Sequence, residues 1–303
     1  MGTPDDTEGG AARGHRPRRG IAAAVVAAVL VAAAGIWVGV TYLLQGGLPW
    51  APSADTVAEE VAASSANPRP AAGPTPSAPP PTSAPALPLE GVRVVLDPGH
   101  NSDNASNPRT IGAQVPDGRG GTKACNTVGT STFDGYPEHA FTWDVADRTR
   151  AFLEDDGAEV FLTRGASGVG PCVDARGQAP GVYEADLMIS IHGNGSESQA
   201  ARGFFVMVVA TPLHELQGEP SQMLAEDVAS SLEEAGFPVS NVSERIGLRN
   251  DLATLNHATR PSVMVELAEF RNPEESQAVQ DPEVRARYAR ALADAVAVWS
   301  ARD

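Results

Sequence analysis

The chain is poor in basic residues and in cysteine. Its 303 residues include 22 Lys and Arg against 38 Asp and Glu, so its net charge is −16 at pH 7. A surface this acidic repels nucleic acid and gives no attraction to anionic lipid headgroups, so we expect no nucleic-acid partner. The two cysteines, Cys125 and Cys172, form no CxxC pair, which excludes a cysteine-based zinc site. The absence of internal repeats excludes repeat architectures.

Charged residues are missing from residues 21–44, IAAAVVAAVLVAAAGIWVGVTYLL. A helix of this length can cross a bilayer core of about 30 Å. Arginines within 13–19 precede the run, so the positive-inside rule keeps residues 1–20 in the cytoplasm and everything after residue 44 outside. A cleaved signal peptide would have a shorter apolar region of about 7–15 residues followed by small residues, whereas bulky side chains at 42–44 end this run. We therefore expect an uncleaved single-pass membrane anchor.

Residues 45–90 are rich in proline and alanine and include the run PRPAAGPTPSAPPPTSAPALP. Such a segment cannot form a packed core, and we expect a disordered, semi-rigid stalk. The stalk either lets the following domain reach a distant target or simply tethers it. Residues 91–303 are enough for one domain with a real core, which we expect to be monomeric and to lie outside the cytoplasm.

Cys125 and Cys172 both follow the expected anchor. Outside the cytoplasm an even pair of cysteines usually oxidises, so we expect a disulfide between them. This bond would fix the long segment 101–137, which is rich in Gly, Thr and Asn. Two buried free thiols are the alternative.

Short apolar segments alternate with amphipathic ones after residue 90. This alternation predicts a single layered α/β domain with a mostly parallel central sheet flanked by helices. The expected strands are 92–97, 158–163, 185–192, 203–210 and 261–267, and the expected helices are 138–157, 219–236 and 281–300.

Polar side chains follow three of these strands. His100 follows VRVVLDPG, His192 follows LMISI, and Glu266 follows PSVMV, while Glu138 opens the helix after the long segment. Ligands of open α/β sheets bind beyond the carboxyl ends of the strands. Two histidines and a carboxylate, with a separate carboxylate to move a proton of water, are the composition of a catalytic zinc site. From the residues alone we expect metal-assisted hydrolysis.

Each of these residues also has an ordinary structural interpretation. His100 and His192 could be loop or core residues, and Glu138 could be favoured by the helix dipole. The adjacent His139 competes with Glu138, since neighbouring helix positions point about 100° apart and cannot both face one ion.

A buried carboxylate at Glu266 needs compensation, because an unpaired charge is costly inside a protein. A metal-bound water is one answer, and a core salt bridge with Arg249 or Arg260 is the other.

Several motifs resemble those of one enzyme family. VVLDPGHN, GYPEH, DDGAEVFLTR, ADLMISIHGN and PSVMVELAEFRNPEE resemble the zinc-dependent N-acetylmuramoyl-L-alanine amidases of the bacterial cell wall, of the amidase-3 type. The segments GRGGTKACNTVGTSTFDGYPEH and GPCVDAR are similar to the mycobacterial and actinobacterial branch. The resemblance covers about residues 91–300.

The resemblance implies roles for individual residues. The zinc ligands fall on His100, Glu138 and His192, and the catalytic glutamate falls on Glu266, with Glu269 a less favoured stand-in. The family cuts the amide between the lactyl group of N-acetylmuramic acid and L-alanine of the stem peptide. This implies that peptidoglycan or its muropeptide fragments are the substrate, for wall remodelling or fragment recycling.

Two departures from the family pattern lie beside the expected ligands. Asn101 and Ser102 stand where Gly-Gly is common, and Gly193-Asn194 replaces Ala-Asn. They could change the width of the pocket but remove no ligand. Two other functions stay open: an inactive zinc-containing wall-binding module, and a different zinc hydrolase such as a peptidase or a deacetylase.

Overall fold

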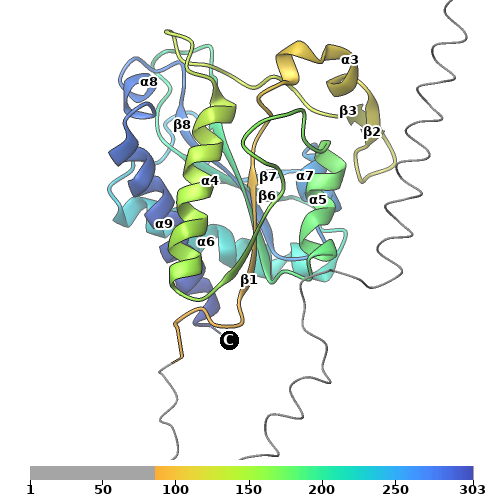
Figure 1. Ribbon diagram of the computed structural model, residues 1–303, viewed down its shortest axis with the longest axis vertical. Coiled ribbons are helices and arrows are strands. Elements are labelled where there is room, and N and C mark those ends of the chain that lie inside the picture. The colour runs from red at the N-terminus through yellow and green to blue at the C-terminus, as the bar shows by residue number, and fades with distance from the viewer. Residues whose placement is uncertain (1–85, 303) are drawn as a thin grey trace, which may run out of the picture. The chain divides into compact units, whose positions relative to one another are not determined.

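The structure, a computed structural model, describes residues 86–302 (Figure 1). The expected anchor, 21–44, and nearly all of the expected stalk, 45–90, lie outside the described residues. Within residues 86–302, no helix combines the length and the apolar character that a membrane span requires.

The described domain is built on a central sheet with the strand order β4-β1-β5-β8-β6-β7. Neighbouring strands are parallel except β6 and β8, which are antiparallel. The prediction of an α/β domain with a mostly parallel sheet is therefore confirmed. The strands are β1 (Arg93–Pro98), β4 (Glu159–Leu162), β5 (Leu187–Asn194), β6 (Phe205–Val209), β7 (Ile246–Arg249) and β8 (Ser262–Glu269).

Helices cover both faces of this sheet (Figure 1). The long helices α4 (Glu138–Asp155), α6 (Glu219–Glu234) and α9 (Pro282–Ser300) pack on one face. The shorter helices α5 (Val173–Val182) and α7 (Ala253–His257) lie on the other. All three predicted helices are present, and the sequence analysis missed α5 and α7.

Strand alternation divides the core between the two faces. In β1, Val94 and Leu96 pack with the helices of the first face, while Val95 packs with Ala179 of α5. Successive side chains of a strand point to opposite faces, so a strand covered on both sides is apolar throughout. This explains the unbroken apolar run before Asp97.

The long segment 101–137 contains short elements of its own. They are a short 3-10 turn, the four-residue helix α3 (Pro108–Ile111), and a hairpin of β2 (Gln114–Pro116) and β3 (Thr122–Ala124). The predicted disulfide between Cys125 and Cys172 is present. It joins Cys125, which directly follows β3, to Cys172, the residue before α5.

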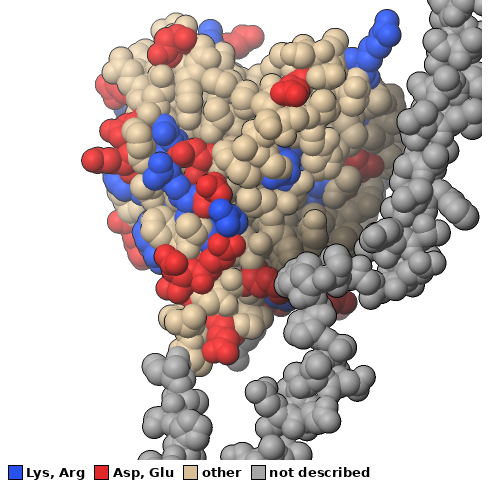
Figure 2. Space-filling model, viewed as in Figure 1, with Lys and Arg blue, Asp and Glu red and all other residues tan. Residues whose placement is uncertain are grey.

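The surface over α4 and α9 carries acidic and basic side chains next to one another (Figure 2). Arg150 pairs with Asp147 at 2.7 Å, and Arg290 pairs with Asp294 at 2.7 Å. Exposed pairs of this kind contribute little to stability. Because the arginines of these two helices are mostly paired with carboxylates, few of them are free to bind an anionic ligand.

Candidate metal centre

His100, Glu138 and His192 reach one edge of the sheet from three separate elements. His100 follows β1 in the left-handed region with φ of 59°, and His192 lies near the end of the neighbouring strand β5. Glu138 is the first residue of α4, which packs against both strands. Because β1 and β5 are parallel, their carboxyl ends meet at the same edge.

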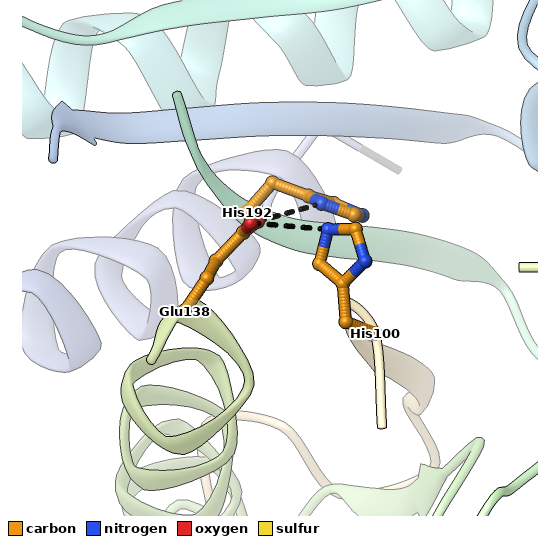
Figure 3. A group of neighbouring side chains, drawn as sticks. All are labelled: His100, Glu138 and His192. Atoms are coloured by element: carbon orange, nitrogen blue, oxygen red, sulfur yellow. Dashed lines mark hydrogen bonds and ion pairs between the residues drawn. The ribbon is translucent and has the colours of Figure 1, made fainter. Parts of the chain in front are cut away.

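The three side chains form a compact cluster (Figure 3). His100 Nε2 lies 3.1 Å from Glu138 Oε2, and His192 Nδ1 lies 3.1 Å from Glu138 Oε1. One candidate ligand atom from each residue lies within 4.8 Å of the other two. One divalent cation could therefore contact all three.

The hydrogen bonds around the cluster leave lone pairs facing its centre. The backbone oxygen of Thr127 accepts a hydrogen bond from His100 Nδ1 at 3.0 Å, so this nitrogen carries the proton. In the neutral ring, Nε2 then presents a lone pair to a carboxylate oxygen. Two acceptors at such a distance need a proton or a cation between them, and the donor set of two histidines and a carboxylate fits zinc.

Backbone amides fix the carboxylate of Glu138. Thr130 N–H donates to Oε2 at 2.9 Å, and Gly193 N–H donates to Oε1 at 3.1 Å. Burial on its own would raise the pKa of Glu138, but positive charge at His100 and His192 holds that pKa well below its usual range. The carboxylate is thus kept ionised, as a metal ligand must be.

Glu266 lines the same cavity as the three clustered residues. The cavity has a volume of about 560 Å³. The Oε2 atom of Glu266 is shielded from solvent and has no hydrogen-bond partner among the described residues. Burial raises the pKa of Glu266 well above its ordinary value, and the Glu138 and Glu269 carboxylates raise it further. A carboxyl group of this kind holds a proton readily, as a general base requires.

The structure gives Glu269 a different environment from that of Glu266. Glu269 is fully buried, and its oxygens accept hydrogen bonds from Asn194 Nδ2 at 2.6 Å and from Ser196 N–H at 3.1 Å. A register shift between β5 and β8 places His192 opposite Glu266 and Asn194 opposite Glu269. Glu269 therefore fixes the loop after β5, while Glu266 faces the cavity.

The structural alternatives for Glu266 are not observed. Arg249 pairs with Asp251 at 2.6 Å, and no ion pair joins Glu266 to Arg249 or Arg260 within residues 86–302. His139 lies outside the cluster and lines a smaller cavity of about 170 Å³.

The sequence analysis missed two buried arginines that bind the backbone of the turn carrying His100. Arg176 pairs with Asp97 at 2.7 Å and donates to the backbone oxygen of His100 at 2.8 Å. Arg164 donates to the oxygens of Pro98 and His139, each at 2.8 Å, and so joins the turn to the start of α4. Asp97 was the available signal, because an acidic residue that ends a buried strand needs a cation nearby.

Asn101, one of the departures from the family pattern, belongs to the same hydrogen-bond network as Arg176. It is buried, and its side-chain amide donates to Asn104 Oδ1 at 3.0 Å. The side-chain oxygen Oδ1 of Asn101 accepts a hydrogen bond from Arg176. Asn101 therefore stabilises the turn that carries His100, and it does not line the cavity that contains Glu266.

Comparisons with known proteins identify one family. A family model, Amidase_3, described as N-acetylmuramoyl-L-alanine amidase, matches residues 94–298. The N-acetylmuramoyl-L-alanine amidase Rv3717 of Mycobacterium tuberculosis is 42% identical over 212 residues, which are 69% of this chain and 86% of the relative. The crystal structure of the amidase Ami1 from Mycobacterium smegmatis has a TM-score of 0.68 and 39% identity, and the match covers 71% of this chain and 99% of that one. The apo form of Ami1 from Mycobacterium abscessus has a TM-score of 0.67 and 40% identity, with 70% and 100% covered.

Proposed function

This chain belongs to the Amidase_3 family of N-acetylmuramoyl-L-alanine amidases. We propose that it hydrolyses an amide bond of peptidoglycan with the help of one zinc ion. The bond broken is the amide between N-acetylmuramic acid and L-alanine. The observation that carries the zinc proposal is the cluster of His100, Glu138 and His192 in one cavity with the unpartnered Oε2 of Glu266.

His100, Glu138 and His192 would hold the ion, with one position left for water or substrate. When bound, a zinc ion supplies Lewis acidity that makes water more acidic and polarises a carbonyl group. The Thr127 carbonyl orients the ring of His100, and two backbone amides orient Glu138. These contacts hold the ligands in place before substrate arrives.

Glu266 has the position and the proton affinity of a general base. It accepts a proton from water as the water oxygen attacks the amide carbon, and it returns that proton to the nitrogen of L-alanine as the C–N bond breaks. The raised pKa of Glu266 favours uptake of the proton. Transfer of one proton in each half of the reaction restores the carboxylate.

Product analysis tests this function. The full chain is incubated with purified muropeptides, and the products are identified by mass spectrometry. We expect free stem peptides that begin with L-alanine together with peptide-free sugars. If the lactyl–alanine linkage survives in every product while another bond is cut, a peptidase or a deacetylase replaces the amidase.

We further propose that residues 21–44 anchor the protein in the cell membrane, with residues 91–303 facing the cell wall as a monomer. The charge-free run and the arginines before it support the anchor. The Cys125–Cys172 disulfide suits an oxidising compartment outside the cytoplasm. Residues 45–90 would set the reach of the domain into the wall.

Protease accessibility tests this placement. Protease added to intact spheroplasts should digest the domain, and the membrane fraction should retain a fragment containing residues 21–44. A domain that is protected until the cells are lysed would contradict the proposal. Sedimentation of the purified chain checks the monomeric state.

A further inference from the structure

A second cavity adjoins the one that contains Glu266. It has a volume of about 320 Å³ and shares two lining residues, Thr130 and Gly195, with the catalytic cavity. Its remaining walls come from the turn before α4, the loop after β5 and Arg271 after β8. The two cavities therefore adjoin at Thr130 and Gly195, so that one ligand can occupy both.

Phe133 is held beside this cavity by a closed turn. Its side chain is 49% exposed. Thr132 N–H donates to the backbone oxygen of Tyr136 at 3.0 Å, and Thr132 Oγ donates to Asp134 at 2.6 Å. Gln280 Nε2 also donates to Asp134, at 3.1 Å, and ties the turn to the segment before α9. The turn thus fixes the backbone that carries a half-exposed aromatic side chain, a feature common in binding surfaces.

The polar groups of the second cavity carry both signs of charge. The guanidinium carbon of Arg271 lies 4.6 Å from the centre of the Phe133 ring. Glu197 and Gln199 line the same cavity. A carboxylate ligand would meet Glu197 as well as Arg271, which disfavours an anion. A neutral ring with several hydroxyl groups can use donors and acceptors together and place its C–H face against the aromatic ring.

We propose that the second cavity is a subsite for a pyranose ring of the glycan strand. The sugar packs against the part of the Phe133 ring that Arg271 leaves open, and it exchanges hydrogen bonds with Arg271, Glu197 and Gln199. This inference rests on the proposed function, because N-acetylmuramic acid carries the lactyl group whose amide is cleaved. It adds which residues of this chain contact a sugar ring and where that ring lies.

Two soluble substrates with the same scissile amide test the subsite. One is a disaccharide-peptide of N-acetylglucosamine and N-acetylmuramic acid, and the other is the same peptide acylated by D-lactate without sugar. For the full chain, we expect Phe133→Ala to lower kcat/KM on the disaccharide-peptide about tenfold more than on the lactyl-peptide. Arg271→Gln should act in the same direction, and Phe133→Trp should restore the preference for the sugar.

Val298→Ala is the matched control. Val298 has the same exposed fraction as Phe133, 49%, and lies in the last turns of α9, outside both cavities. This variant should leave kcat/KM unchanged on both substrates.

Three results would overturn the subsite. One is an equal loss on both substrates, and another is no loss in Phe133→Ala. The third is a loss in Arg271→Gln that depends on free carboxylates of the peptide, which would assign the cavity to the stem peptide. A wild-type chain that cleaves neither substrate would instead refute the proposed function, and the subsite with it.

Discussion

The turn that carries His100 depends on one buried ion pair. Asp97 and Arg176 are almost completely buried, and Asp97 also accepts a hydrogen bond from Ser190 Oγ at 2.6 Å. Arg176 reaches past Asp97 to the backbone oxygens of Pro98 and His100. The pair therefore connects the stability of the domain to the position of a proposed metal ligand.

Acid should weaken the domain through Asp97. Burial on its own would raise the pKa of Asp97, but Arg176, Ser190 and Thr163 outweigh it and lower the pKa below its ordinary value of 3.8. A depressed pKa in the folded state stabilises the fold above pH 3.8, and this contribution is lost as the pH falls through the folded pKa. Urea unfolding between about pH 2 and pH 5 should show this loss, and Asp97→Asn should flatten the dependence.

Replacing Arg176 should lower the free energy of unfolding more than replacing Asp97. Arg176→Met leaves the Asp97 carboxylate buried without its partner, and we expect a loss of about 3–5 kcal/mol in the free energy of unfolding at neutral pH. Urea unfolding measures it. A loss below about 1 kcal/mol would show that solvent reaches Asp97 and that the pair does not hold the turn.

Gly129 lies close to the proposed ligands in a conformation that suits glycine. Its φ is 84°, and a Cβ atom there would lie 2.8 Å from Glu138 Oε2. We expect Gly129→Ala to weaken zinc affinity at least about tenfold, since outer contacts of ligands contribute about this much. Gly120→Ala is the control, because φ is 91° and no atom lies within 4 Å of the added Cβ. Equal zinc affinity in both variants, measured by competition with a chelating dye, would contradict this role.

At the scale of elements, the disulfide fixes the segment that supplies a wall of the catalytic cavity. Cys172 precedes α5 directly, and Val173 N–H donates to the backbone oxygen of Cys125 at 2.8 Å. Thr127, which orients His100, follows two residues after Cys125. The covalent bond thus holds both the Thr127 segment and the helix that carries Arg176.

Loss of the disulfide should lower the free energy of unfolding of the domain. For a sequence separation of 47 residues, the chain-entropy account gives roughly 4 kcal/mol. The double variant Cys125→Ala and Cys172→Ala should unfold at correspondingly lower urea concentration. Reductant should weaken the wild type but leave the variant unchanged. A wild type that unfolds at the same urea concentration after its disulfide has been fully reduced would show that the bond does not constrain the unfolded chain.

At the scale of the whole molecule, periodic segments were predictable and tertiary contacts were not. The apolar positions Phe141, Val145 and Leu153 define α4, and all three are fully buried. Helix α5 was missed because Gly177 and Pro180 lie inside it, so packing against the sheet sustains a helix that local preference disfavours. The edge strand β7 was missed because its four residues have no buried pattern.

The candidate site was predictable as far as it follows from strand ends. Parallel strands bring His100 and His192 to one edge, and helix α4 brings Glu138 to it. Arg164 and Arg176 act through contacts with residues 22 to 79 positions away, and no local pattern marks such contacts. Glu269 accepts hydrogen bonds from the loop after β5, whereas Oε2 of Glu266 has no partner among the described residues. The sequence does not predict this difference either.

The zinc content of the purified full chain, measured together with amidase activity, tests the central claim most directly. We expect about one zinc ion per wild-type chain and reversible loss of activity with a chelator. His192→Ala should lose both zinc and activity, whereas Glu266→Gln should keep the zinc and lose activity by about a thousandfold. A wild-type chain that cleaves muropeptides without bound metal, or a Glu266→Gln chain of normal activity, would contradict the account.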